Sequence, residues 1–367
     1  MQIVEFAGGS LRFLEQLPAR ALENGFVWIA VERPALEREL PLLQQAAQEL
    51  GGSTLLDLHL KDLGNAAHPS HYDYTSVYDL MIFRRLSTHA ELPSEGDDAS
   101  ELPSHGESLP AFGHIRTQPV GFVAFDRLLI TVHTPGCVVA RTFTERFAAE
   151  GNQPNGSGAV ARSRQPSHPD DLMLRMLNVM VDSYLELRKH LARELEHWQR
   201  QLLMPRSRGA DWGALMSARQ ALHVLEDLCE EQNDAVQEWL DAHQEDPPPG
   251  MRQAEHDNLV ARARDVIEHI ARVMHHVRRM EHGAETAVQI HFSAQGQRTN
   301  ETMRVLTALT AVFLPLNLIT GFFGMNFEFL PLIHSVGAMW IVLAMMLVVA
   351  VVLLVLFWRK RYLARTG

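Results

Sequence analysis

Two long uncharged stretches near the C-terminus stand out from the rest of the chain. Residues 305–327 and 329–358 contain no formally charged side chain, and Glu328 is the one charge between them. A transmembrane helix needs about 20 largely apolar residues, so each stretch is long enough to cross a bilayer. The pattern predicts a transmembrane hairpin, made of a first helix over 301–327, a loop over 328–336 and a second helix over 337–358.

Helical apolar spacing continues upstream of this hairpin. From Asp170 to about Met204, apolar residues recur at steps of three and four. A second such stretch runs from about Trp212 to His243. The two helices should pair antiparallel, and the prolines at 247–249 force a turn after the second one because consecutive prolines cannot continue a helix.

No strong helix stop occurs between Gln253 and Phe323. At 1.5 Å per residue, one helix over this range would be about 105 Å long, far more than a membrane requires. Pro315 is tolerated within a span because neighbouring groups can satisfy the freed carbonyl. We therefore predict a helical stalk over residues 170–300 that continues into the first span.

The first 150 residues have the pattern of a mixed α/β domain. Short runs of β-branched and aromatic residues predict strands, and one stretch has helical spacing. The predicted strands cover 26–31, 77–86, 120–125 and 128–133, and the predicted helix covers 34–50. Residues 90–110, rich in Ser, Pro, Gly, Asp and Glu, predict a disordered insertion. Residues 151–169 predict a linker.

The charge is unevenly distributed along the chain. The 367 residues carry a net charge of −11, but residues 301–367 hold two acids and five bases, a balance of +3, so residues 1–300 carry −14. Nucleic acids are bound by basic faces, so the composition argues against a nucleic-acid partner. An acidic domain is instead compatible with concentrating cations.

The basic cluster Arg359–Arg361 follows the second span directly. Basic residues beside a span mark its cytoplasmic side, so residues 359–367 are predicted to form a cytoplasmic tail. Two crossings return the chain to its starting side, so both termini are expected in the cytoplasm and loop 328–336 in the periplasm. Met1–Ser10 lacks the features of a signal peptide. Cys137 and Cys229 form no CxxC motif, so we expect neither a disulfide framework nor a cysteine zinc site.

A motif at the end of the first span gives the clearest indication of function. The chain reads RTNETMRVLT at 298–307, FLPL at 313–316 and GFFGMNFE at 321–328. Gly-Met-Asn alone would be a weak signal. Its place at the end of the first of two C-terminal spans, after this longer pattern, makes the match specific. The region resembles the CorA-type magnesium channel family.

This resemblance implies an α+β membrane protein with an N-terminal cytoplasmic α/β domain, a long helical stalk and a two-helix transmembrane hairpin. It implies a homopentameric pore in the inner membrane, with Gly324, Met325 and Asn326 as the selectivity filter. Mg²⁺ dehydrates reluctantly, so a ring of Asn326 amide oxygens is expected to hold the ion through its water shell. Five copies of Glu328 would add negative potential at the pore mouth.

One face of the first span is the predicted pore lining. An amide inside a span usually faces a helix partner or water, which points to Asn317. Residues at steps of three and four share its face, and an apolar constriction on such a face can gate by dewetting. The alternative for the apolar members is ordinary helix packing. The predicted pore-lining residues are Met303, Leu306, Thr310, Leu314, Asn317 and Gly321.

The chain departs from the family pattern at two places. Residues 330–333 read LPLI, where the family usually has Met-Pro-Glu-Leu, so one acid is lost from the loop. Gln289 stands about where the family often has an aspartate for a regulatory Mg²⁺, and a neutral amide binds a bare divalent ion poorly. Mg²⁺ is thus expected as the transported ion, and Gln289 weakens the expectation that Mg²⁺ is also a regulator.

The leading hypothesis is influx of Mg²⁺, with Co²⁺ or Ni²⁺ as further ions. The expected partners are further copies of the chain, membrane lipid and divalent cations. The chain has no GxxxxGK[ST] motif and no evident nucleophile and base, so we expect neither an enzyme nor an organic cofactor. A first alternative is a Zn²⁺ transporter of the related ZntB type, although the nineteen histidines form no zinc-site motif. A second is a membrane-tethered scaffold or sensor that passes no ion.

Overall fold

The computed structural model describes residues 1–7, 10–18, 25–87, 112, 115–151, 165–203, 212–247, 251–325 and 336–359. By its internal contacts the chain divides into an N-terminal unit, Met1–Glu285, and a C-terminal unit, Thr286–Gly367. The predicted insertion at 90–110 and residues 152–164 of the predicted linker lie outside the described residues.

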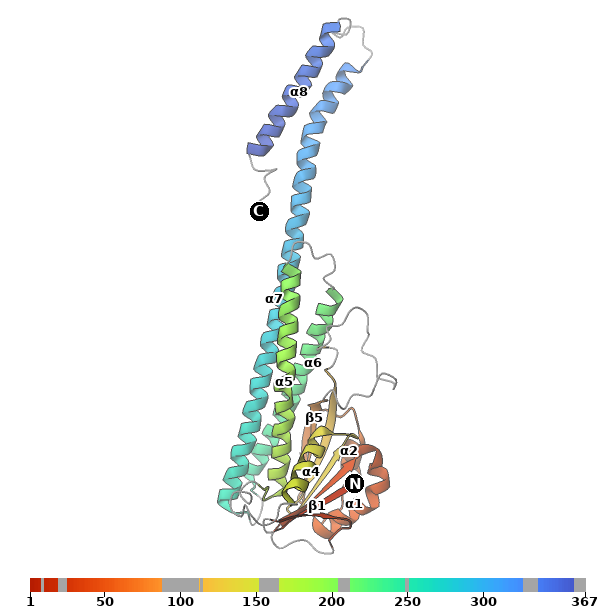
Figure 1. Ribbon diagram of the computed structural model, residues 1–367, viewed down its shortest axis with the longest axis vertical. Coiled ribbons are helices and arrows are strands. Elements are labelled where there is room, and N and C mark those ends of the chain that lie inside the picture. The colour runs from red at the N-terminus through yellow and green to blue at the C-terminus, as the bar shows by residue number, and fades with distance from the viewer. Residues whose placement is uncertain are drawn as a thin grey trace. The chain divides into compact units, whose positions relative to one another are not determined.

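The N-terminal unit is built on a seven-stranded sheet with the order β2-β1-β3-β7-β6-β5-β4. Figure 1 labels β1 and β5 of this sheet. β3 and β7 pair in parallel, and the other neighbouring strands are antiparallel. The four predicted strands correspond to β3, β5, β6 and β7, whereas the sequence pattern misses β1, β2 and β4. The strands are β1 (Gln2–Ala7), β2 (Ser10–Leu14), β3 (Gly25–Glu32), β4 (His71–Tyr74), β5 (Asp79–Leu86), β6 (Thr117–Ala124) and β7 (Leu128–His133).

Helices cover both faces of this sheet. Successive strand residues point to opposite faces. On one face, Ile29 of β3 belongs to a buried cluster with Leu43 of α1 and Leu63 of α2. On the other face, the indole of Trp28 packs edge-on against Phe147 of α4, with ring centroids 6.1 Å apart. The short elements are η1 (Arg33–Ala35), α1 (Leu36–Leu50), α2 (Asp57–Gly64) and α4 (Val138–Gly151).

Three long helices follow the sheet. They are α5 (Pro169–Leu203), α6 (Trp212–Glu245) and α7 (Gln253–Phe323). These bounds confirm the helices predicted from apolar spacing. α5 lies against β3, β5, β6 and β7, and α6 contacts β4 and β5. α7 is one helix of 71 residues with Pro315 inside it, and it contributes residues to both units.

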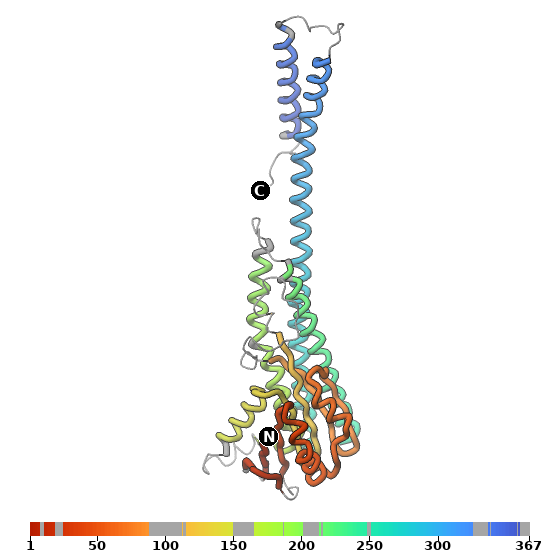
Figure 2. The backbone as a smooth tube through the Cα atoms, turned by 90° about the vertical axis from the view of Figure 1, so that its right-hand side faces the viewer, coloured from red at the N-terminus to blue at the C-terminus, as the bar shows by residue number. Residues whose placement is uncertain are grey.

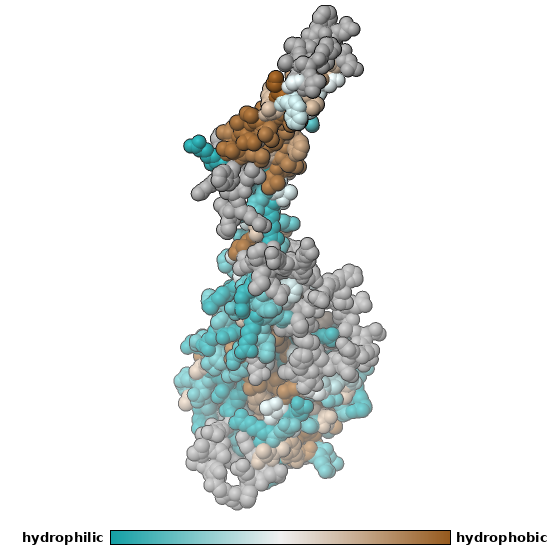
Figure 3. All heavy atoms as spheres, turned by 45° about the horizontal axis from the view of Figure 1, so that its top comes forward, coloured by the Kyte–Doolittle hydropathy of each residue, from teal (hydrophilic) through white to brown (hydrophobic). Residues whose placement is uncertain are grey.

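The C-terminal unit contains the last part of α7 and α8 (Val336–Arg359). Both helices are long and apolar enough to cross a membrane. Figures 1 and 2 show α8 running back beside the end of α7. Large apolar side chains are exposed on both, including Leu318 at 72% and Trp340 at 62%, and Figure 3 shows hydrophobic atoms gathered over this unit. An apolar surface of this extent indicates contact with lipid or with other subunits.

Candidate functional site

The first candidate site is the end of α7. The helix ends at Phe323, where the N–H of Gly324 donates to the Thr320 carbonyl at 2.9 Å and the N–H of Met325 to the Phe322 carbonyl at 3.4 Å. A Cβ at position 324 would lie 2.9 Å from the Thr320 oxygen, closer than real Cβ atoms approach. The turn therefore favours glycine. Asn326 and Glu328, the other predicted members of this site, lie outside the described residues.

The six predicted pore-lining residues are all exposed in the chain. Met303 is 57% exposed, Leu306 55% and Leu314 67%, and Thr310, Asn317 and Gly321 are exposed as well. A different set on the same segment is at least partly shielded: Ala308, Val312, Pro315, Ile319 and Phe323. At 3.6 residues per turn, the two sets are centred roughly 180° apart.

The shielding is explained by α8, the helix that lies beside this part of α7 in both views (Figures 1 and 2). The predicted lining therefore points away from the partner span of its own chain. Two polar side chains on the predicted lining differ in their hydrogen bonding. The Thr310 hydroxyl donates to the Leu306 carbonyl at 2.9 Å, whereas the Asn317 amide makes no hydrogen bond within the part of the chain that the structure describes. In a bilayer such an amide requires a partner or water.

A second candidate site lies inside the N-terminal unit, at the start of β5. Ligand atoms of Asp79, Asp170 and His243 lie within 4.8 Å of one another. Nε2 of His243 is 3.4 Å from Asp79 Oδ2 and 3.8 Å from Asp170 Oδ2. Nδ1 of His168 is 3.0 Å from the same Asp170 oxygen. The Tyr72 hydroxyl donates to the other oxygen of Asp79 at 3.2 Å.

Burial and charge shift the pKa values of this cluster. Burial raises the pKa of Asp79 to about 6, and the nearby Asp170 carboxylate adds to the rise. Burial alone would also raise the pKa of Asp170, but hydrogen bonds and charges from His168 and His243 hold it below its usual range. Burial lowers the pKa of His168 and His243, but the Asp170 carboxylate outweighs it, so both values are raised. Asp170 therefore stabilises the protonated forms of His168 and His243.

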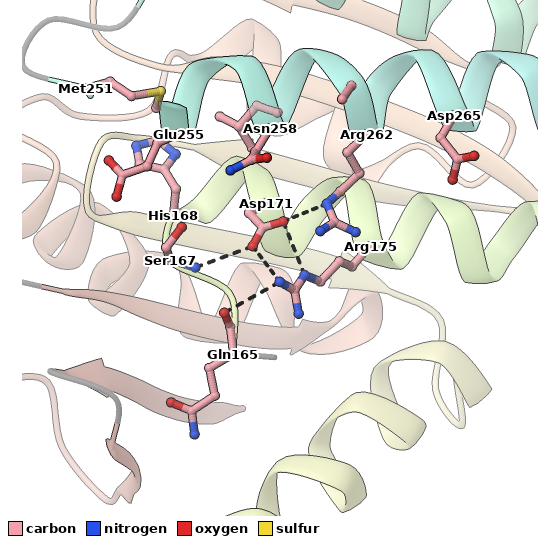
Figure 4. Close-up of a pocket in the computed structure, with 12 residues that line it drawn as sticks. Gln165, Ser167, His168, Asp171, Arg175, Met251, Glu255, Asn258, Arg262 and Asp265 are labelled. Carbon is pink, nitrogen blue, oxygen red and sulfur yellow. Dashed lines mark hydrogen bonds and ion pairs between the residues drawn. The ribbon is translucent and has the colours of Figure 1, made fainter. Parts of the chain in front are cut away.

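A pocket of about 620 Å³ adjoins this cluster, and His168 lines it. Its walls come from the start of α5, the start of α7 and the segment before α5 (Figure 4). Asp171 accepts from Nη2 of Arg175 at 2.9 Å and forms an ion pair with Nε of Arg262 at 2.8 Å. Glu255 and Asp265 add two further carboxylates. The pocket thus holds three carboxylates and two arginines, and Glu255 is paired with a further arginine, Arg252.

A third group, His223, Glu226 and Glu281, also brings ligand atoms together. Here Glu226 is hydrogen-bonded to the guanidinium of Arg278, which lowers its pKa. An arginine on the carboxylate competes with a metal ion, so we favour the group around Asp79. Cys137 and Cys229 are free and buried.

Comparison with known proteins identifies the family. A sequence profile described as CorA-like Mg²⁺ transporter protein matches residues 23–361, most of the chain. The chain belongs to the CorA-like Mg²⁺ transporter family. It is 27% identical over 194 residues to the cobalt/magnesium transport protein CorA of Thermotoga maritima, an alignment that covers 53% of each protein. The chain thus spans about half the length of this relative in the matched segment.

Solved structures share the fold of this CorA-family chain. The complete CorA magnesium transporter from Methanocaldococcus jannaschii matches with a TM-score of 0.73 at 16% identity, over 100% of this chain and 98% of that one. The ZntB cytoplasmic domain from Vibrio parahaemolyticus matches with a TM-score of 0.53 at 11% identity, over 81% and 98%. At these identities the matches show the fold alone. They confirm the predicted order of α/β domain, long helix and two apolar C-terminal helices.

Proposed function

We propose that this CorA-family protein mediates influx of divalent cations, Mg²⁺ first among them, through a homopentameric pore in the inner membrane, and that it is not an enzyme. The supporting observation is the exposed face of α7 that carries Met303, Leu306, Leu314 and Asn317. This face lies opposite the partly shielded face of the same helix, and Gly324 follows the end of the helix. Figure 2 shows α8 beside the end of α7. Several copies packed around an axis would bring these faces together, with the α8 helices outside.

The proposed filter is a ring of Asn326 side chains beside Gly324 and Met325. Amide oxygens accept hydrogen bonds from the waters of a hydrated ion without replacing them, which suits Mg²⁺ because it keeps its water shell. Asn317 would supply a second polar level below the ring, and the apolar level from Met303 to Leu314 would act as the constriction. Glu328 would place negative charge at the entrance, as expected for cation entry.

The proposed topology places both termini in the cytoplasm. Arg359, the last described residue of α8, begins the basic segment that favours this side. Influx then follows the membrane potential, which supplies about 2.3 kcal/mol per charge per 100 mV, or about 4.6 kcal/mol for a divalent ion. No resident organic cofactor is proposed, and Gln289, which is exposed on α7, is a weak candidate for binding regulatory Mg²⁺.

Two other functions compete with Mg²⁺ uptake. A Zn²⁺ transporter is supported by the fold shared with the cytoplasmic domain of a ZntB protein. A non-transporting scaffold or sensor would use the same fold and assembly without an ion path.

Ion flux into proteoliposomes distinguishes these functions. Fluorescent dyes would report Mg²⁺, Co²⁺ and Zn²⁺ entry with and without a pH gradient, for the wild type, Asn326→Ala and a control, Leu343→Ala, on the exposed surface of α8. We expect Mg²⁺ flux that Asn326→Ala reduces and Leu343→Ala does not. Undiminished flux in a normally assembled Asn326→Ala channel removes the filter role. Flux of Zn²⁺ alone favours the ZntB type, and an assembled protein that passes no ion favours a scaffold.

A further inference from the structure

The cluster around Asp79 brings together three side chains that could bind a metal ion. Its three ligand atoms come from the start of β5, the start of α5 and the end of α6. Asp170 and His243 are buried, with 4% and 7% of their surface exposed. Three separate elements thus direct two carboxylates and one imidazole to the same interior point.

The two distances from His243 to the carboxylates are too long for hydrogen bonds, unlike the 3.0 Å between His168 Nδ1 and Asp170 Oδ2. Nε2 of His243 lies 3.4 Å from Asp79 Oδ2 and 3.8 Å from Asp170 Oδ2, whereas N–H···O bonds fall at about 2.7–3.2 Å. Ligands that sit about 2.0–2.1 Å from a tetrahedral ion are about 3.3–3.4 Å from one another. The observed spacing therefore leaves room for an ion between the three groups.

Neighbouring groups fix the ligands in orientations suited to an ion. Nδ1 of His243 lies 3.0 Å from the Trp239 carbonyl, which can only accept, so Nδ1 carries the hydrogen and Nε2 points at the carboxylates. The Tyr72 hydroxyl donates to Asp79 Oδ1 and leaves Oδ2 for the cluster. Metal-binding histidines and carboxylates are held in this way by outer hydrogen bonds.

The ligand chemistry selects among divalent ions. Mg²⁺ prefers oxygen ligands in octahedral geometry and retains several waters, which suits a solvated site better than this buried one. One imidazole and two carboxylates match the nitrogen and oxygen ligands of Zn²⁺. Two carboxylates beside a neutral imidazole also carry the negative charge that a divalent ion balances.

A side chain of the neighbouring pocket contacts the cluster. His168 lines this pocket, and its Nδ1 lies 3.0 Å from Asp170 Oδ2, so one side chain belongs to both the pocket wall and the cluster. Figure 4 shows His168 beside Glu255, a carboxylate that is paired with Arg252.

We propose that Asp79, Asp170 and His243 form a Zn²⁺ site inside the N-terminal unit, with His168 as the nearest further donor. This site is separate from the ion path proposed on α7. It would join β5, α5 and the end of α6 by one ion. The same end of α6 is tied to α7, because Nε2 of His256 lies 2.9 Å from the His243 carbonyl oxygen.

Zinc titration of the purified full chain tests this proposal. The protein, in detergent with any affinity tag removed, is dialysed against a chelator and titrated with Zn²⁺ in competition with a chelating dye. The variants are Asp79→Asn and His243→Gln, with Asp73→Asn and His275→Gln as controls that remove the same residue types outside the cluster. Tyr72→Phe removes only an outer hydrogen bond.

We expect Asp79→Asn and His243→Gln each to lose one tightly bound Zn²⁺ per chain, with affinity at least about 100-fold weaker, since even outer-shell changes cost 10–100-fold. Tyr72→Phe should keep the site with affinity weakened within that range, and excess Mg²⁺ should not displace the ion. Equal Zn²⁺ number and affinity in the wild type, Asp79→Asn and His243→Gln would overturn the proposal and leave a proton-linked ion pair. Should His243→Gln fail to fold, Asp79→Asn decides, because its amide is nearly isosteric and keeps an acceptor for Tyr72.

Discussion

Replacing Asp79 by asparagine should stabilise the N-terminal unit at neutral pH when no divalent metal is present. The carboxylate forms an ion pair with His243, yet burial and the charge of Asp170 raise its pKa from the ordinary 3.8 to about 6. Above pH 6 the carboxyl group of Asp79 is ionised in the native state, although its surroundings favour the protonated form by about 2 pKa units. At 1.36 kcal/mol per unit, this costs up to about 3 kcal/mol. The neutral amide of Asp79→Asn removes that cost.

The gain has a defined dependence on pH. The folded pKa of Asp79 lies above its unfolded value, so the native wild type binds the extra proton and gains stability as the pH falls through about 6. The difference between Asp79→Asn and the wild type should therefore be largest above pH 6 and should disappear near pH 4. Zn²⁺ at the proposed site should reverse the order, because the wild type alone would then gain the binding free energy.

Hydrogen exchange measured by mass spectrometry suits a protein of two units, since it reports opening free energies segment by segment. Peptides from β5 and β6 of the full chain should gain up to roughly 100-fold in protection in Asp79→Asn at about pH 7.5, the equivalent of about 3 kcal/mol. Asp73→Asn, at a half-exposed carboxylate that pairs with His59, is the control and should not increase protection. Lower protection in Asp79→Asn than in the wild type at this pH would refute the reasoning, because the carboxylate would then be a net stabilising partner.

Three further substitutions test other parts of the structure. Asn317→Ala should reduce Mg²⁺ flux in proteoliposomes several-fold, whereas Ile319→Ala on the shielded face should not; equal effects would contradict the assignment of faces. Gly324→Ala should reduce flux at least about tenfold, the equivalent of 1.4 kcal/mol, because its Cβ would meet the Thr320 oxygen at 2.9 Å. Gly337→Ala, with nothing within 4 Å, is its control, and a loss of flux there would make the Gly324 result uninformative about the turn. Gly51→Ala should lower the free energy of unfolding of the N-terminal unit by about 1–3 kcal/mol, measured by exchange in α1. The added Cβ would lie 2.7 Å from Cε1 of Phe125 and closer still to Cδ1, whereas Gly64→Ala, 3.9 Å from Leu36, should be neutral.

The elements that sequence predicts well are those whose pattern is local. α7 follows from the absence of a helix stop between Gln253 and Phe323, and α8 from its uncharged apolar run. β1 and β2 are missed because polar residues interrupt their apolar residues within only five or six positions, whereas β7, also six residues long, is a nearly continuous apolar run. Their place is set by pairing at a distance, as where Ile3 lies opposite Ile29.

The interior cluster could not have been predicted from the sequence. Its ligands are more than 70 residues apart, and each has an ordinary local explanation. Asp170 stands in the first turn of α5 and His243 in the last turn of α6, where acids and histidines are favoured by the helix dipole. Only the fold brings them to Asp79. At the end of α7 the sequence motif identifies the candidate residues, Asn326 and Glu328. Both lie outside the described residues, so their roles stay predictions.

The two candidate sites would recognise divalent cations by different chemistry, so the ion that is transported and the ion bound inside the N-terminal unit are separate questions. An amide ring at Asn326 would bind through water and so favours an ion that keeps its hydration shell. The carboxylates and imidazole of the interior cluster would replace that shell and favour Zn²⁺. Zinc bound at Asp79 and His243 is therefore no argument for zinc transport, and Mg²⁺ flux is no argument against an interior zinc site. Asp79→Asn should remove the bound Zn²⁺ and leave the ion preference of flux unchanged, because Asp79 lies outside the face of α7 proposed to line the pore.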